Sequence, residues 1–278
     1  MMKLSIITIN FNDRDGLEKT IQSVINQTFQ DFEYIVVDGA STDGSVDVIK
    51  KYSDRLTHWV SEPDSGIYNA MNKGTQMASG EYCLYLNSGD FLAEDDVLER
   101  LFENDFNEDI VSCGLHLFSE KESWLQLPPQ NISLYTFVNG SLPHPSTLIR
   151  KTKLDELGGY NEDYRIVSDW IFFLDALVAC RCSYKVYDMV LSKFNCYGLS
   201  STSVDKRDQE MRTYLLQRYP AIYADYLPFE EEAVYNVLRW IRNFPIFKEI
   251  IIFPFKVLNR LFRLRNRLSI RVRVYKLH

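Results

Sequence analysis

The chain has 278 residues, of which 46% are apolar, and a formal net charge of −7. This length allows one large domain with a substantial core, and the 17 Tyr and 17 Phe residues exclude wholesale disorder. No run reaches the roughly 18 uncharged apolar residues of a membrane-spanning helix. The start of the chain does not resemble a signal peptide, so we expect a cytoplasmic protein.

The five cysteines lack the paired spacing of a metal site, and we expect reduced thiols. They are Cys83, Cys113, Cys180, Cys182 and Cys196.

Charge is distributed unevenly along the chain. The segment 239–278 contains eleven Lys or Arg residues and one acidic residue, Glu249, a net charge of +10, whereas the preceding 238 residues carry −17. Opposite charges in two parts of one chain indicate two separate roles.

Strand and helix patterns alternate over the first hundred residues. Short β-branched or apolar runs predict strands at 3–9, 33–37, 56–60 and 81–86. Apolar residues at spacings of three and four predict a helix around 17–25, and further helices are expected near 45–50 and 67–77. This alternation predicts a doubly wound, mostly parallel α/β sheet.

The pattern changes after about residue 101. We expect strands at 109–117 and 146–149, a strongly apolar helix at 168–178, and two closing strands at 184–187 and 190–194. Helices are expected at 204–218 and 229–242. The predicted organisation is a domain over 1–220, with halves 1–100 and 101–220, followed by a basic and apolar helical extension over 221–278.

Small polar residues follow each of the first four predicted strands. They lie in the segments Thr8–Asn12, Asp38–Asp43, Glu62–Gly66 and Asn87–Asp90. Ligands of open α/β sheets bind at the carboxyl ends of the strands, so four such loops in register indicate a site. One loop alone would be ordinary turn chemistry. The glycine-rich dinucleotide and Walker motifs are absent, which favours a nucleotide whose diphosphate is bridged by a divalent cation.

Five motifs in order resemble the family 2 glycosyltransferases of GT-A fold, of the type that builds bacterial cell-surface polysaccharides. They are SIITINFN (5–12), VVDGASTDGS (36–45), EPDSGIYNAMNKG (62–74), LYLNSGDF (84–91) and GGYNEDYRIVSDW (158–170). Their order and spacing match over roughly residues 1–200.

The resemblance implies a role for several residues. It implies that the nucleotide-sugar, typically a UDP-sugar, is bound by Thr8, Asn10, Asp38, Asp64 and Asn87, with Asp38 accepting a hydrogen bond from the base. Asp90 would bind Mn²⁺ or Mg²⁺ on the donor diphosphate, and Asp169 would be the general base. Asn87 and Gly89 stand where carboxylates are frequent in the family, so the protein would supply few metal ligands.

The implied activity is inverting transfer of a single sugar to a saccharide or a polyprenyl-linked acceptor, because the processive Q-x-x-R-W motif is absent. Two other functions stay open. One is nucleotidyl transfer to a sugar phosphate, although 8–16 lacks the expected Gly-rich basic loop. The other is a degenerate sugar-nucleotide-binding scaffold, which the reduced metal motif favours.

Two residues and one segment each allow two interpretations. Asp169 is either the base or a first-turn helix acid. His144, between two prolines, either lines the acceptor side or is a structural loop histidine. The segment 197–201 is either a lid over the diphosphate or an ordinary turn.

The basic segment alternates Phe, Ile and Leu with Lys and Arg. This pattern favours attachment to the inner face of the cell membrane, where basic groups meet anionic headgroups. Contact with a second copy of the chain is the second option. The high content of large apolar residues argues against nucleic acid.

Overall fold

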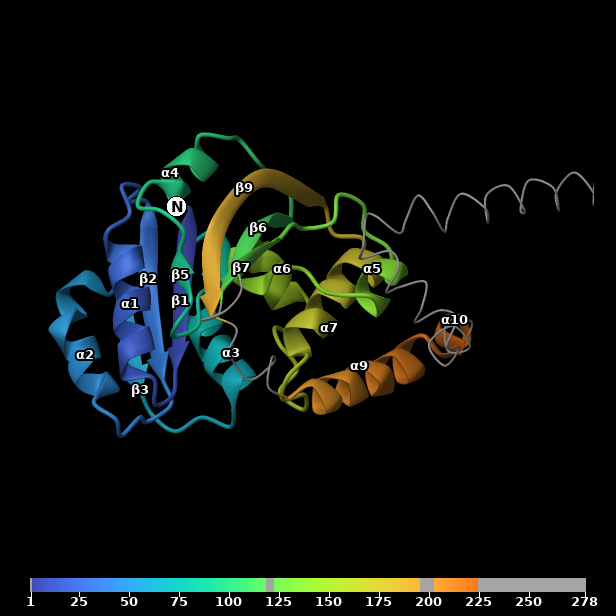
Figure 1. Ribbon diagram of the computed structural model, residues 1–278, viewed down its shortest axis with the longest axis horizontal. Coiled ribbons are helices and arrows are strands. Elements are labelled where there is room, and N and C mark those ends of the chain that lie inside the picture. Colours follow the sequence, from blue (N-terminus) through green and yellow to red (C-terminus); the bar gives the residue numbers. More distant parts are fainter. Residues whose placement is uncertain (1, 119–122, 196–202, 225–278) are drawn as a thin grey trace, which may run out of the picture. The chain divides into compact units, whose positions relative to one another are not determined.

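The computed structural model describes residues 2–118, 123–195 and 203–224, and Figure 1 shows their arrangement. Cys196, the predicted lid at 197–201, the predicted helix at 229–242 and the basic segment therefore lie outside the described residues. The chain divides into two compact units, Met1–Arg212 and Thr213–His278. The first unit contains every predicted site residue.

One sheet of nine strands forms the centre of the first unit. Its order is β3-β2-β1-β4-β8-β6-β9-β5, and β7 pairs with β6 outside this path. In chain order the strands are β1 (Leu4–Asn10), β2 (Phe32–Asp38), β3 (His58–Ser61), β4 (Tyr82–Tyr85), β5 (Phe91–Leu92), β6 (Ile110–Phe118), β7 (Ser123–Gln126), β8 (Thr147–Arg150) and β9 (Tyr184–Asn195).

Strands β3, β2, β1 and β4 are all parallel, which confirms the predicted doubly wound half. Strands β1, β2 and β4 are buried almost throughout, and every residue of β1 is buried, whereas the edge strand β3 is partly exposed. The register places Asn10 beside Asp38 and Asp38 beside Ser61. The polar residues that end these strands therefore form one row at the carboxyl edge of the sheet.

Helices cover the two faces of this parallel half. The described part of the whole chain has the helices α1 (Arg14–Ile25), α2 (Ser45–Lys51), α3 (Ile67–Met77), α4 (Val97–Phe102), α5 (Leu134–Val138), α6 (Lys151–Glu156), α7 (Ser168–Leu174), α9 (Val204–Arg218) and α10 (Pro220–Ala224), of which α10 belongs to the second unit. In Figure 1, α1 and α2 lie on one side of β1–β3 and α3 lies on the other.

The packing of α3 on its face of the sheet depends on a glycine. A Cβ on Gly74 would lie 2.4 Å from a methyl group of Ile7, so the helix can approach β1 closely only with glycine there. On the other face, Leu17 and Ile21 of α1 and Ile49 of α2 join one buried cluster with Ile6 and Val36 of the strands. Helices therefore cover both faces of the parallel half of the sheet.

The second half of the first unit is mixed rather than parallel. Strand β8 runs antiparallel to both β4 and β6, whereas β9 runs parallel to β6 and antiparallel to β5. The two closing strands expected at 184–187 and 190–194 are one continuous strand, and that expectation was wrong. Register shifts on either side of Gly114 absorb the extra residues, because a bulge lets a strand bend without ending.

The predicted apolar helix at 168–178 also differs in detail. Regular α7 ends at Leu174, and a π-helical turn continues it over Asp175–Ala179. Such a turn widens a helix locally and cannot be read from apolar periodicity. The prediction also missed the short elements β5, β7, α4, α5 and α6, which have too few residues to show a period.

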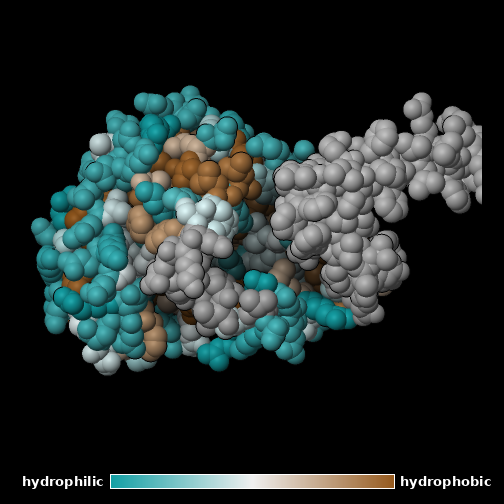
Figure 2. All heavy atoms as spheres, viewed as in Figure 1, coloured by the Kyte–Doolittle hydropathy of each residue, from teal (hydrophilic) through white to brown (hydrophobic). Residues whose placement is uncertain are grey.

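Figure 2 shows one face of the molecule, whose described surface is mostly hydrophilic with an apolar patch over β6 and β9. Strand β7, which pairs with β6, also carries exposed apolar side chains: Trp124 and Leu125 are 44% and 58% exposed, and as neighbours on a strand they point to opposite faces. No helix in the described ranges combines the length and the apolar character needed to cross a membrane.

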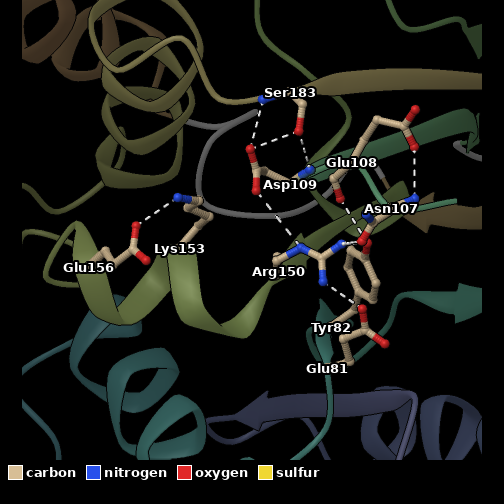
Figure 3. Close-up of polar contacts among 9 residues, drawn as sticks. All are labelled: Glu81, Tyr82, Asn107, Glu108, Asp109, Arg150, Lys153, Glu156 and Ser183. Carbon is tan, nitrogen blue, oxygen red and sulfur yellow. Dashed lines mark hydrogen bonds and ion pairs between the residues drawn. The ribbon is translucent and has the colours of Figure 1, made fainter.

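A polar cluster joins strands at the edge opposite the site, around Arg150 at the end of β8 (Figure 3). The guanidinium group donates to the Glu81 carboxylate, to the Tyr82 hydroxyl at 2.6 Å and to the Asn107 side chain at 2.8 Å. It also lies 4.7 Å from the centre of the Tyr82 ring. Nearby, Asp109 accepts hydrogen bonds from Ser183, the residue before β9. The cluster therefore connects the starts of β4, β6 and β9 to the end of β8.

We expect Arg150→Met to lower the free energy of unfolding by about 2 kcal/mol, because it removes the three hydrogen bonds that the guanidinium group donates to Glu81, Tyr82 and Asn107. The side chain of Arg150 is only 16% exposed. Arg100, which is 45% exposed and also pairs with carboxylates, provides the control. Arg100→Met should change stability by less than about 1 kcal/mol in urea unfolding. Equal losses in the two variants would contradict a structural role for the cluster.

Candidate active site

The carboxylate of Asp38, at the end of β2, is the centre of the first group of site residues. One oxygen, Oδ1, accepts hydrogen bonds from Asn10 Nδ2 at 2.7 Å and from the Ser41 hydroxyl at 2.6 Å. The other, Oδ2, accepts from the Ser61 hydroxyl at 2.6 Å and from the Ser41 backbone N–H at 3.0 Å. Asp38 is fully buried. Four donors thus occupy the four lone-pair positions of this carboxylate.

These donors determine the charge of Asp38. Burial alone would raise the pKa of the Asp38 carboxyl, but the hydrogen bonds from Ser41, Ser61 and Asn10 outweigh it, so the pKa is below its usual value. The group is therefore a buried carboxylate that stays ionised at neutral pH. It fixes a negative charge at the carboxyl edge of the sheet.

The loops after β1 and β2 are bonded to each other. The Asn12 backbone N–H donates to the Ser41 hydroxyl at 2.8 Å, and the Asn12 side chain accepts from the Thr42 backbone N–H at 2.8 Å. Asn12 and Ala40 both have left-handed backbone conformations, with φ of 51° and 60°. Non-glycine residues rarely adopt this conformation, so the paired loops hold the backbone in a shape that is costly in isolation.

Asp64, in the loop after β3, lies against the same group. A Cβ on Gly39 would be 2.5 Å from Asp64 Oδ2 and 3.1 Å from the Phe11 ring, so glycine allows the two side chains to approach the β2 loop. Asp64 Oδ1 also accepts from the Gly66 backbone N–H at 2.9 Å. The Phe11 ring is 66% exposed. An exposed aromatic ring therefore borders the buried charge of Asp38.

Thr8 has a different environment from the other predicted donor-side residues. Its side chain is fully buried in β1, and its hydroxyl lies 3.0 Å from the Tyr34 hydroxyl. These contacts place it in the core beneath the loop. Its contact with a nucleotide stays a prediction.

The second group of site residues is the loop Asn87–Asp90 after β4. The Asp90 backbone N–H donates to the Asn87 carbonyl at 2.9 Å, and Gly89 has φ of 89°. A glycine with positive φ at the third position is what a tight type II turn requires. The Ser88 N–H donates to the Ile9 carbonyl at 3.0 Å, which aligns the loop with the end of β1.

Helix α1 fixes this loop through one buried hydroxyl. Thr20 Oγ1 donates to the Asp90 carbonyl at 2.7 Å and accepts from the Gly89 backbone N–H at 3.0 Å. Ser23 of α1 accepts from the Leu92 N–H, and Gln27, two residues past the end of α1, donates to the Glu94 carbonyl. Polar side chains of α1 and of the residues that follow it therefore hold the backbone from Gly89 to Glu94.

Asn87, Asp90 and Asp13 carry oxygen atoms of the kind that a hard divalent cation prefers. Asn87 Oδ1 is buried and has no hydrogen-bond partner among the residues that the structure describes. Asp13, the N-cap of α1, places Oδ2 3.4 Å from the position of a Cβ on Gly89. Asp90 is 3% exposed. Within the described part of the chain no three acidic, His or Cys side chains form a metal cluster, so a cation here would need further oxygens from a ligand.

The third group surrounds Asp169, in the first turn of α7. Asp169 Oδ1 accepts from the Tyr68 hydroxyl at 2.7 Å, and the same hydroxyl lies 2.7 Å from the Ile166 carbonyl. Tyr68 belongs to the first turn of α3, the helix that begins after the Asp64 loop. Helix α3 thus connects the Asp64 loop, at the carboxyl edge of the sheet, to Asp169. The sequence pattern does not indicate this contact, because the spacing of Tyr68 within the helix is that of a core aromatic residue.

His144 is 7% exposed and lies inside an aromatic cluster. Its Nε2 is 2.8 Å from the Tyr160 hydroxyl, and its ring stacks on Tyr85 at 5.2 Å. Burial lowers the pKa of His144, while the charge of Asp169 acts in the opposite direction. A buried, neutral histidine with these contacts stabilises the fold, and its contact with an acceptor stays a prediction.

The structure brings Asn10, Asp38 and Asp64 to one row of loops, places Asn87 and Asp90 on the adjacent loop, and links Asp169 to them through α3. Sequence analysis missed Phe11, Asp13, Thr20 and Tyr68. Only Phe11 and Asp13 carried a signal, because each follows a strand at the carboxyl edge. Thr20 and Tyr68 lie within helices, where their spacing is that of core residues.

Comparison with known proteins gives a family match. The model of the family described as "Glycosyl transferase family 2" matches residues 5–177, more than half of the chain. An uncharacterised glycosyltransferase of Mycobacterium tuberculosis is 32% identical over 254 residues, covering 85% of this chain and 94% of that protein. A PGL/p-HBAD biosynthesis glycosyltransferase of Mycobacterium bovis is 29% identical over 209 residues, covering 73% and 80%.

Solved structures share the fold. TarS 1–349 of S. aureus, in complex with UDP-GlcNAc, has a TM-score of 0.60 at 17% identity, covering 89% of this chain and 81% of that one. The mannosyltransferase PcManGT of Pyrobaculum calidifontis, in complex with GDP-Man and Mn²⁺, has a TM-score of 0.59 at 16% identity, covering 77% and 63%. These similarities confirm the predicted GT-A architecture.

We expect Ser61→Ala to weaken stability only where Asp38 is ionised. Because folding lowers the pKa of Asp38, its carboxylate stabilises the fold above the unfolded value near 3.8, and that contribution is lost as pH falls through the lower folded value. Losing one bond to a charged group should cost about 1.5–3 kcal/mol at pH 7, and less as falling pH protonates Asp38 in the folded protein. Urea unfolding at a series of pH values from 7 downward measures the difference. Ser53→Ala, at an exposed serine, should have little effect at any of these pH values.

We expect Thr20→Val to free the Asn87–Asp90 loop, because valine keeps the shape of the side chain but loses the hydroxyl. The Gly89 amide should then exchange its hydrogen at least about tenfold faster in NMR, as expected for a lost hydrogen bond of about 1.4 kcal/mol. Thr20→Ser, which retains the hydroxyl, should exchange at nearly the wild-type rate. Unchanged protection of Gly89 in Thr20→Val would show that the loop is held by other contacts.

Proposed function

The chain belongs to glycosyl transferase family 2, and from this premise we propose that it transfers one sugar, with inversion, from a UDP-sugar to a hydroxyl group of a saccharide or polyprenyl-linked saccharide. The observation that carries the proposal is the family match itself, because residues 5–177 include the Asp38 group, the Asn87–Asp90 loop and Asp169. The geometry of these groups supports a donor site and a separate base.

The proposed donor side contains the negative charge of Asp38 and the flat apolar ring of Phe11. The exposed Phe11 ring would stack on the base, as aromatic rings do on nucleobases in other proteins. Asp38 would accept from an N–H of the base, and since its four acceptor positions are filled, the base has to replace a Ser41 or Ser61 hydroxyl. The complex of TarS with UDP-GlcNAc supports a uridine nucleotide. Thr8, Asn10, Asp64 and Asn87 are proposed to complete this side.

Asp90 and Asn87, with Asp13 beside them, would hold Mn²⁺ or Mg²⁺. When bound, the ion would neutralise the charge that develops on the departing nucleoside diphosphate. The complex of PcManGT with Mn²⁺ supports this proposal. The contribution of the protein is a rigid loop: Thr20 fixes the carbonyl of Asp90, so its carboxylate starts from a defined backbone position.

Asp169 is the proposed general base. It would take the proton from the acceptor hydroxyl as that oxygen attacks the anomeric carbon from the face opposite the diphosphate, which inverts the configuration. The Tyr68 hydroxyl donates to one carboxylate oxygen, Oδ1, and in the proposed step the other oxygen, Oδ2, would take the proton. His144 is a weaker proposal for the acceptor side, since its ring is buried.

The relative named for PGL/p-HBAD biosynthesis supports an acceptor of the glycolipid type. We further propose that the basic segment 239–278, which lies outside the described residues, attaches the chain to the inner face of the membrane or joins two copies. Flotation with liposomes tests this. Binding that requires acidic lipid supports attachment, whereas loss of a dimer on truncation after residue 236, without lipid binding, supports the second copy.

A panel of UDP- and GDP-sugars, with and without Mn²⁺, tests the function. We expect one UDP-sugar to raise the melting temperature and to be consumed only with the metal. Asp169→Asn should keep donor binding and lose about 10²- to 10⁴-fold in turnover. Asp163→Asn, an exposed acid in the same segment, is the matched control and should retain turnover.

Two outcomes would count against the proposal. Wild-type turnover in Asp169→Asn would remove the base assignment. Donor binding without hydrolysis or transfer under any condition would instead indicate a binding scaffold.

A further inference from the structure

The Tyr68 hydroxyl has two acceptors and one proton. It lies 2.7 Å from Asp169 Oδ1 and 2.7 Å from the Ile166 carbonyl oxygen. A carbonyl oxygen and an ionised carboxylate can only accept hydrogen bonds, and a tyrosine hydroxyl donates one. Tyr68 therefore cannot donate fully to both at once. Which oxygen receives the proton depends on the charge of Asp169.

The stronger acceptor changes when Asp169 changes its protonation state. An ionised carboxylate receives hydrogen bonds roughly twice as strong as a neutral acceptor does, so it takes the Tyr68 proton while it is charged. Once the carboxyl is neutral, that advantage is lost and the Ile166 carbonyl, at the same distance, is available. Rotation about the C–O bond of the tyrosine is sufficient to exchange one partner for the other.

The surroundings keep the tyrosine oxygen in place during this exchange. Tyr68 is 5% exposed, and its ring packs against that of Tyr160 at 5.7 Å. Burial, followed by the charge of Asp169, raises the pKa of Tyr68 well above its ordinary value, so the hydroxyl keeps its own proton. The hydroxyl oxygen therefore stays in place, while its proton can point either to Asp169 or to the Ile166 carbonyl.

We propose that Tyr68 is a positioning residue for the general base, donating to Asp169 while that carboxylate is ionised and to the Ile166 carbonyl after it has taken a proton. The inference rests on the proposed function of Asp169. In the step itself, the acceptor O–H bond breaks, an O–H bond forms on Asp169 Oδ2, and the proton of Tyr68 stays on its own oxygen. The tyrosine thereby orients Oδ2 toward the acceptor and satisfies the carbonyl afterwards.

Steady-state kinetics of Tyr68→Phe tests the proposal. We expect kcat to fall at least about tenfold, because the carboxylate loses its fixed orientation, while the KM of the donor changes less than about twofold. The matched control is Tyr85→Phe. It removes another buried tyrosine hydroxyl from the same aromatic cluster, but one that bonds Thr75 rather than Asp169, and kcat should stay within about twofold.

A double variant separates a positioning role from a structural one. If Tyr68 acts through Asp169, adding Tyr68→Phe to Asp169→Asn should reduce the residual turnover by less than about twofold. The same fall in the Asp169→Asn background as in the wild-type background would overturn the proposal. So would wild-type kcat in Tyr68→Phe.

A second substitution covers the case in which Tyr68→Phe does not fold. Fluorotyrosine at position 68 keeps the hydroxyl and makes it a stronger donor, so kcat should change, whereas fluorotyrosine at position 85 should leave it unchanged. Equal kcat in the wild type and the fluorinated protein would then overturn the proposal. Failure of the proposed function is recognised separately, since in that case either the wild type shows no turnover or Asp169→Asn is as active as the wild type.

Discussion

The four hydrogen bonds to Asp38 are the constraint on which the donor side depends, because they join the ends of three parallel strands. Asn10 comes from β1, Ser41 from the loop after β2 and Ser61 from β3. A buried carboxylate without these donors would be costly, and the donors without the carboxylate would be buried polar groups lacking an acceptor. The Asp38 carboxylate therefore holds the ends of all three strands together. Next to it, Asn12 and Ala40 keep their left-handed backbone conformations.

The other two carboxylates of the site are held by different means. The backbone of Asp90 is fixed by the Thr20 hydroxyl of α1, and the side chain of Asp169 is fixed by the Tyr68 hydroxyl of α3. The two helices lie on opposite faces of the parallel half (Figure 1). A change in one helix can therefore alter one carboxylate without moving the other, so the metal binding proposed for Asp90 and the proton transfer proposed for Asp169 could vary independently.

Much of the fold could be predicted from the sequence because its signals are local. The helix at 67–77 and the parallel strands β1 and β2 are long, regular and bounded by polar loops. The bulged strand β9 was divided in two, since its continuity depends on pairing with β6. The site was predicted as a set of strand ends, yet Thr20 and Tyr68 were missed. Their partners lie 70 and 101 residues away, and no local pattern reports a contact over such a separation.

Strand β5 has a consequence for how the protein is assembled. It follows Asp90 directly and pairs with β9, with Phe91 beside Lys193 and Leu92 beside Ser192. During synthesis the loop that carries Asp90 leaves the ribosome about a hundred residues before the strand that secures its far side. At about 5–20 residues per second, several seconds pass before β9 follows. A nascent chain ending before residue 192 already has the strands of the parallel half and the α1 contacts of the loop, and it gains the pairing of β5 only when β9 follows.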